Sequence, residues 1–197
     1  MKRNILTLSG AGIAAAILSS SAFADLAGST AAHVYVNVDP NVSVGVLTSN
    51  LQLPTVQVGT TTANVGFRVD ANQENVWLGI LTTDLYKGDD PTNSDVNPLG
   101  VDLPMGATIT PDNATPTQGA TNVAVYNTTP TTYNGFNAYQ TNYVNFESSQ
   151  NGHFSQDIHV AVGWDQNDPE QPQGEYSGYV VLYTALQAPP VAPGAGS

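Results

Sequence analysis

The sequence predicts an all-β protein built as a β-sandwich, and two patterns support this prediction. Much of the chain consists of short segments in which apolar and polar residues alternate, the period expected of half-buried strands. Stretches rich in Gly, Pro, Asn and Asp, residues that favour turns, separate these segments. No segment after residue 24 has a sustained helical pattern. Many short strands separated by turns favour a sandwich over an α/β fold.

The first 24 residues have the three-part pattern of a secretory signal peptide. Lys2 and Arg3 precede an apolar stretch, and Ala-Phe-Ala before Asp25 is a small-residue cleavage pattern. A membrane anchor is disfavoured because the apolar stretch is short and is interrupted by Ser and Gly. We therefore expect an exported chain of 173 residues (197 − 24), which suits one domain with its own core.

Charge and cysteine content exclude several classes of protein. Cleavage would leave Arg68 and Lys87 as the basic residues against 16 acidic ones, a formal net charge of −14 (2 − 16). Nucleic acid and anionic membrane surfaces would repel such a chain, so we expect neither nucleic-acid binding nor stable membrane insertion. The chain has no cysteine, which excludes disulfides, thiol nucleophiles and thiolate metal sites.

Two alternating valine runs follow the expected cleavage site and a small, polar stretch over residues 25–32. The valines are Val34, Val36 and Val38 in the first run and Val42, Val44 and Val46 in the second. The first run suits the first strand of the chain's own sandwich. It equally suits insertion into another sheet, where backbone hydrogen bonds give affinity and alternate side chains fill pockets. The residues alone leave both interpretations open.

Further strands are expected along the rest of the domain, which we place at residues 40–186. They are predicted around Val56 and Val58 and over residues 65–69, 76–86, 107–110, 122–126, 133–146, 154–164 and 176–186, with a turn at 71–74 and a loop-rich region over 87–121. The tail, residues 187–197, is rich in Pro, Gly and Ala, which predicts disorder.

The last two strands are predicted to form a hairpin. In the first, Phe154, Ile158, Val160, Val162 and Trp164 share one face. The second, residues 176–186, is apolar on both faces, which predicts deep burial. The connection between them, DQNDPEQPQG, is typical of a turn.

Few residues suggest chemistry, and we expect no enzyme, no cofactor and no metal site. His153, Asp157 and His159 share a strand face, but the two histidines would stand about 20 Å apart at ~3.3 Å per residue. The acidic loops at residues 89–95 and 165–170 resemble calcium loops only faintly, because neither has the twelve-residue pattern. No Gly-x-Ser-x-Gly motif is present.

The aromatic residues over 126–146 allow two interpretations. Aromatic side chains can form a sugar-binding surface, but at strand spacing they more often form core or cross-strand pairs. The chain offers Tyr126, Tyr133, Phe136, Tyr139, Tyr143 and Phe146 here.

Two stretches of the chain resemble the alternate chaperone–usher fimbrial subunits, the major pilins of the colonisation-factor-antigen type. The first is HVYVNVDPNVSVGVLTSNLQLP, residues 33–54, with a Val-rich strand, Val-Asp-Pro, an apolar strand and Leu-Pro in the order that the family has. The second is PQGEYSGYVVLYTAL, residues 172–186, which is similar to the family's closing strand. The two stretches cover about a fifth of the chain.

This resemblance implies an incomplete immunoglobulin-like sandwich that a neighbour's N-terminal donor strand completes. It implies that Val34, Val36 and Val38 are donor-strand residues within an extension over residues 25–39. It places Val42, Val44 and Val46 in the first strand of the subunit's own fold. The implied partners are other copies of the chain, a periplasmic chaperone, an outer-membrane usher and a host glycan or protein receptor.

The function that follows from the resemblance is a structural subunit of an extracellular fimbria. It would pass through the periplasm and polymerise by donor-strand exchange, for adhesion or biofilm. The alternative is a free-standing secreted β-sandwich that binds glycan or calcium through its long loops.

Overall fold

The computed structural model describes residues 35–117 and 120–186 of the chain. The predicted signal peptide and the predicted disordered tail lie outside these residues. The chain divides into two units after Val38, and the fold that follows is that of the unit beginning at Asp39. Residues 35–40 belong to no strand.

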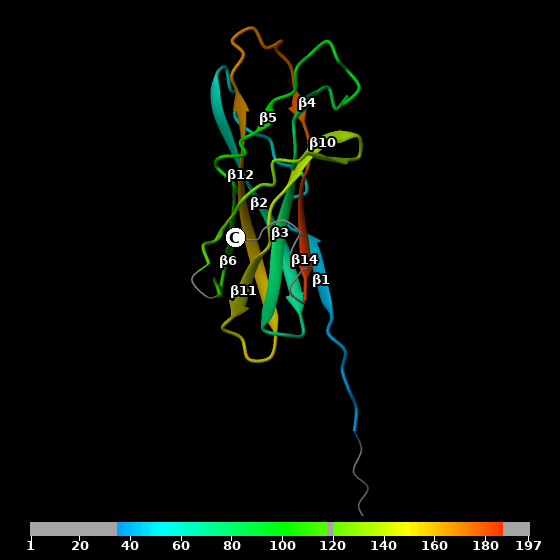
Figure 1. Cartoon of the computed structure of the whole chain (residues 1–197), viewed down its shortest axis with the longest axis vertical. Coiled ribbons are helices and arrows are strands. Elements are labelled where there is room, and N and C mark those ends of the chain that lie inside the picture. Colours follow the sequence, from blue (N-terminus) through cyan, green and yellow to red (C-terminus); the bar gives the residue numbers. More distant parts are fainter. Residues whose placement is uncertain (1–34, 118–119, 187–197) are drawn as a thin grey trace, which may run out of the picture. The chain divides into compact units, whose positions relative to one another are not determined.

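The described residues form strands and no helix (Figure 1). The strands are β1 (Val42–Val46), β2 (Gly59–Ala71), β3 (Asn75–Thr83), β4 (Tyr86–Lys87), β5 (Gly100–Val101), β6 (Ala107–Pro111), β7 (Ala114–Pro116), β8 (Val123–Ala124), β9 (Thr131–Tyr133), β10 (Phe136–Gln140), β11 (Val144–Ser148), β12 (Phe154–Gln166), β13 (Tyr176–Ser177) and β14 (Val180–Ala185). The prediction of an all-β fold is confirmed for the residues that the structure describes.

The strands make two main antiparallel sheets. Sheet 1 has the order β1-β2-β12-β6-β8, with β5 also paired to β12. Sheet 2 has the order β7-β11-β3-β10-β9, with β14 also paired to β3. Leu78 of β3 lies opposite Val144 of β11 and also opposite Thr184 of β14, so β14 occupies the edge of β3 that β11 and β10 leave. A small third sheet joins β13 to β4.

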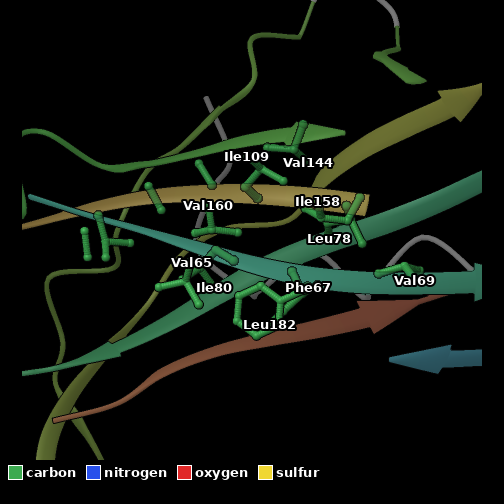
Figure 2. Packing of buried hydrophobic residues seen from close by; sticks show 14 of the residues in the cluster. Val65, Phe67, Val69, Leu78, Ile80, Ile109, Val144, Ile158, Val160 and Leu182 are labelled. Atoms are coloured by element: carbon green, nitrogen blue, oxygen red, sulfur yellow. The ribbon is translucent and has the colours of Figure 1, made fainter. Parts of the chain in front are cut away.

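The hydrophobic core lies between the two main sheets. Figure 2 shows labelled side chains from both sheets, among them Phe67 of β2, Ile80 of β3 and Val160 of β12, pointing into the space between the ribbons. The predicted inner face of β12 is confirmed, because all five of its predicted apolar residues are buried. These residues are Phe154, Ile158, Val160, Val162 and Trp164.

The predicted terminal hairpin is wrong. β12 belongs to sheet 1, whereas β14 belongs to sheet 2, so the connection over residues 167–175 crosses from one sheet to the other. Hairpins usually have connections of two to five residues, and this longer one has room to span the two layers. The prediction of deep burial is also wrong, because only Leu182 of β14 is fully buried. β14 is an edge strand, and an apolar composition does not distinguish an edge from a centre.

Several smaller elements also differ from prediction. Val56 and Val58 precede β2 and lie in no strand. β6 matches the strand predicted over residues 107–110, but the loop-rich region also contains β5 and β7, and the aromatic segment contains β10 and β11 rather than one strand. β5 and β7 have only two and three residues, which show too little alternation to be recognised in the sequence.

The different burial of two valines predicts that replacing each by alanine lowers the free energy of unfolding by different amounts. Val160→Ala removes two carbons from a fully buried site and should cost about 2 kcal/mol of unfolding free energy. Val46→Ala alters a side chain that is 59% exposed and should cost under about 0.5 kcal/mol. Urea unfolding of both variants tests this, and equal costs would contradict the described core.

Candidate functional site

One side of the sandwich leaves two strand edges unpaired. In the described residues β1 pairs only with β2, and β14 pairs only with β3. The two strands approach each other although they belong to different sheets, and Figure 1 shows them side by side. β1 is antiparallel to β2, the chain reverses at the short turn between β2 and β3, and β14 is antiparallel to β3. β1 and β14 therefore run in opposite directions. We call the facing free edges of β1 and β14 the open edge.

The valines of β1 face the core but are incompletely covered. Val44 lies opposite Val69, and Val46 lies opposite Phe67. Residues directly opposite in an antiparallel pair share a face of the sheet. Val69 and Phe67 are buried in the core, yet Val44 is 43% exposed and Val46 is 59% exposed. The core is therefore uncovered along the open edge, where a further strand would bury these side chains.

Contacts hold β14 on both of its faces, while its free edge pairs with no strand among the described residues. On the inner face Leu182 is buried, and Val180 and Leu186 pack against the core. On the outer face the Tyr183 ring lies directly over Gly79, where any side chain would collide with it. The Tyr183 hydroxyl donates to the Thr141 carbonyl oxygen over 2.7 Å. β14 thus presents a fixed row of backbone groups.

The opposite side of the sandwich is built differently. Its outer strands are β8 in sheet 1 and β7 and β9 in sheet 2, with two, three and three residues, and Pro111 and Pro116 end β6 and β7. Short strands and prolines discourage edge-to-edge pairing. β1 (VSVGV) and β14 (VVLYTA) have neither proline nor a charged residue. The open edge therefore lacks the features that normally block association of sheets.

The predicted site residues fall in three places. Val34 lies outside the described residues. Val36 and Val38 are described, belong to the first unit, and are 85% and 77% exposed. Val42, Val44 and Val46 lie in β1, with Val42 partly buried against the core.

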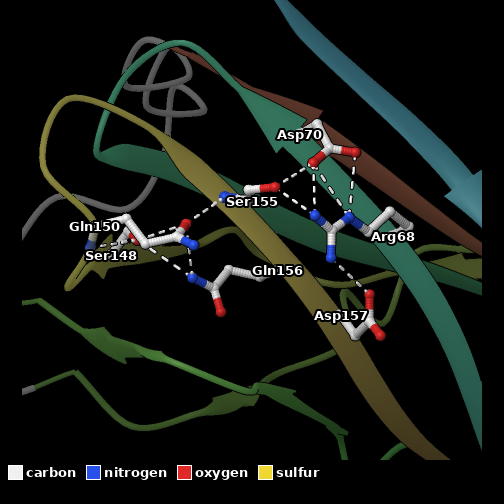
Figure 3. A network of polar contacts seen from close by, with 7 residues as sticks. All are labelled: Arg68, Asp70, Ser148, Gln150, Ser155, Gln156 and Asp157. Carbon is white, nitrogen blue, oxygen red and sulfur yellow. Dashed lines mark hydrogen bonds and ion pairs between the residues drawn. The ribbon is translucent and has the colours of Figure 1, made fainter.

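The outer face of sheet 1 carries a polar network that the sequence analysis did not identify (Figure 3). Arg68 of β2 donates to Asp70 and to Asp157 of β12, with both closest contacts at 2.9 Å. Ser155 donates to Asp70 over 2.5 Å and also contacts Arg68. The hydrogen bonds that Asp70 accepts lower its pKa, and the one from Arg68 has a larger effect than the one from Ser155. The network joins the two central strands of the sheet.

The histidines take separate roles, and the described residues contain no group of three His, Asp or Glu placed to hold a metal. His159 faces Asp112 at 3.5 Å. The His153 ring makes a hydrogen bond to the Asn151 carbonyl oxygen. Asp157 is bound to Arg68.

Carboxylates of the acidic loops bind their own loops. Asp90 accepts hydrogen bonds from the backbone and hydroxyl of Thr92, and Asp168 accepts one from the backbone of Glu170. The contacts of Asp90 and Asp168 are the local turn-forming bonds that Asp commonly makes. Asp165, by contrast, accepts a hydrogen bond from the hydroxyl of Thr60, which lies opposite it on β2. Calcium binding through these loops stays part of the alternative function.

The aromatic rings contact one another and the core. Phe136 is buried between Tyr86 and Tyr179 in edge-to-face contacts, with ring centres 5.2 and 5.1 Å apart. Tyr133 contacts Tyr179, and Tyr143 contacts Tyr183, in the same manner. This favours the packing interpretation, and glycan binding remains part of the alternative function.

Asp84 is a buried carboxylate that the sequence analysis did not single out. It accepts hydrogen bonds from the Val101 backbone at 2.9 Å and from Asn137 at 2.6 Å. Burial raises its pKa despite these bonds. Because both contacts lead to neighbouring strands, β5 and β10, Asp84 joins elements of the fold.

Comparison with known proteins does not assign the chain to a family. No protein-family model matches the chain, and no curated protein matches it. Within the described residues, no helix is long and apolar enough to cross a membrane.

The Arg68 network predicts a pH-dependent contribution to stability. The pKa of Asp70 is lowered below 3.8 in the folded protein, so its ionised form stabilises the fold above that pH. Asp70→Asn should lower the unfolding free energy at pH 7 by up to about 1 kcal/mol, since the network is exposed. The difference should shrink as the pH falls below 3.8, because Asp70 of the unfolded chain is then protonated, and it should disappear once the pH passes below the lowered pKa of the folded protein.

Urea unfolding at pH 7 and pH 2.5 measures this difference. Glu147→Gln is the control, because this exposed carboxylate makes no side-chain hydrogen bond in the described residues. A deficit of Asp70→Asn that is equally large at both pH values would contradict the assignment.

Proposed function

We propose that this protein is a structural subunit of an extracellular fimbria, an incomplete immunoglobulin-like sandwich that polymerises by donor-strand exchange. The observation that carries the proposal is the open edge, where Val44 and Val46 point toward the core yet remain exposed. Unpaired backbone groups next to uncovered apolar side chains favour the addition of a strand. The subunit would be held by a periplasmic chaperone and assembled by an usher, as the resemblance implies.

The proposed occupant of the open edge is the N-terminal valine run of a second copy. Val34, Val36 and Val38 alternate with polar residues, so an inserted strand would place three apolar side chains on one face. The described valines of this run, Val36 and Val38, are strongly exposed. Their burial would remove apolar surface from water, worth about 25 cal/mol per Å².

The chain's own C-terminal tail is a poorer occupant by its chemistry. Pro189, Pro190 and Pro193 have no backbone N–H to donate to the free edge of β14. The valine run has no proline between Val34 and Val38. A strand from another copy therefore meets the hydrogen-bonding needs of the edge better.

Two single variants test donor and acceptor separately. In the mature chain, residues 25–197, Val36→Arg should disable the donor run, and Val46→Arg should disable the open edge. Each variant refolded alone should stay monomeric, because burying an unpaired Arg is costly. Their mixture should form dimers only, as the intact run of Val46→Arg enters the intact edge of Val36→Arg. Unboiled SDS gels and size-exclusion chromatography measure the species.

Val125→Arg is the matched control, because Val125 is 60% exposed and lies outside the open edge. It should form the same multimers as the wild type. A wild-type chain that stays a folded monomer at all concentrations, or intact multimers from Val36→Arg, would overturn the proposal. The alternative of a free-standing secreted sandwich would then be tested by glycan and calcium binding.

A further inference from the structure

We propose that Asn72 is a positioning residue that directs the N-terminal segment to another copy of the chain and away from its own open edge. This inference rests on the proposed function. Such a residue is needed because the N-terminal segment of a subunit competes with the segments of other copies for the open edge of the same subunit. A segment tethered by a few residues has an effective concentration of about millimolar at its own site. At lower subunit concentrations, self-filling would compete strongly with polymerisation unless something opposed it.

The contacts of Asn72 hold the three residues before β1. The Asn41 backbone N–H donates to Oδ1 of Asn72 over 2.7 Å, and Nδ2 of Asn72 donates to the Asp39 carbonyl oxygen over 2.8 Å. The Asn72 backbone N–H donates to the Asn41 carbonyl oxygen over 3.2 Å. One side chain therefore binds the backbone on both sides of Pro40.

These contacts continue the register of β1 with β2. Val42 lies opposite Ala71, so the Asn41–Asn72 bond is the next step of the same ladder. Residues 39–41 are thereby held alongside the β2–β3 turn, in line with β1. Pro40 has no N–H and a restricted φ, which limits other conformations of this short segment further.

Filling its own edge would require the chain to reverse direction within these same residues. The returning strand would pair with the free edge of β1 through a hairpin whose loop is residues 39–41, a length that hairpins commonly use. That reversal would break the bonds of Asn72 to Asp39 and Asn41. Insertion into a second copy leaves them intact, so Asn72 favours exchange between copies.

The neighbouring residue holds the other strand of the open edge. Nε2 of Gln73 donates to the Leu186 carbonyl oxygen, directly after β14, over 2.9 Å, and to the Asn75 carbonyl oxygen over 2.6 Å. Two adjacent turn residues thus fix the start of β1 and the end of β14. The open edge is held at this end by the chain itself, without an inserted strand.

The test compares self-filled monomers with multimers. The mature chain and its Asn72→Ala variant are refolded at concentrations from about 10 μM to about 1 mM, which bracket the effective concentration of the tethered segment, then separated by size exclusion and on unboiled SDS gels. Loss of two side-chain hydrogen bonds should raise the ratio of monomer to multimer about tenfold. Asn72→Asp keeps the acceptor for Asn41 and loses the donor to Asp39, so it should give an intermediate ratio. Asn75→Ala, an exposed asparagine without a side-chain hydrogen bond in the described residues, should resemble the wild type.

A second readout separates redirection from simple damage. Self-filled Asn72→Ala monomers should unfold at a higher urea concentration than Val36→Arg monomers, whose edge stays empty. The double variant Val36→Arg/Asn72→Ala should lose this advantage, because its N-terminal run can no longer fill the edge. The role of Asn72 would be overturned by an unchanged ratio of monomer to multimer, or by Asn72→Ala monomers that unfold at the same urea concentration as Val36→Arg monomers. In either case, multimers of the wild type would still uphold the proposed function. Absence of wild-type multimers would overturn the proposed function itself and this inference with it.

Discussion

The pairing of β2 with β12 is the interaction on which the rest of the structure depends. Thirteen residues of each strand lie opposite one another in one register, from Ala71 and Phe154 to Gly59 and Gln166. This register places the apolar side chains of both strands on the inner face, against which sheet 2 packs. It also places Arg68 beside Asp157 on the outer face. β1 pairs with the other edge of β2 in a register that sets Val44 opposite Val69 and Val46 opposite Phe67, so both valines of β1 turn inward as well.

The two sides of the sandwich differ in how their sheets end. On one side, short strands and prolines end the sheets. On the other, two longer apolar strands lie next to each other without a common neighbour in the described residues. A chain without cysteine has no disulfide with which to stabilise such a side. Strand addition from another copy would supply both the hydrogen bonds and the cover that the core lacks.

Local alternation made much of the fold predictable. The inner face of β12 follows from five apolar residues in one phase, and this phase holds wherever one face of a sheet is buried. The place of β14 was not predictable in the same way. Its residues are apolar on both faces because Leu182 packs inward while Tyr183 covers Gly79 on the outside, and this pattern also suits a central strand. Its neighbour β3 lies about a hundred residues earlier in the chain, a distance that periodicity does not bridge.

The sequence by itself determined the strand content, the faces of the longest strands, the acidic charge and the absence of thiol chemistry, because each depends on residue type or on spacing within one segment. Tertiary structure alone decided that β1 and β14 are edges, that Val44 and Val46 lack cover, and that Asn72 binds Asp39 and Asn41. Each of these facts depends on which segments become neighbours. Hydrogen-bonded pairing between distant strands, together with the packing of two sheets on one core, sets those neighbours, and neither leaves a local pattern in the chain.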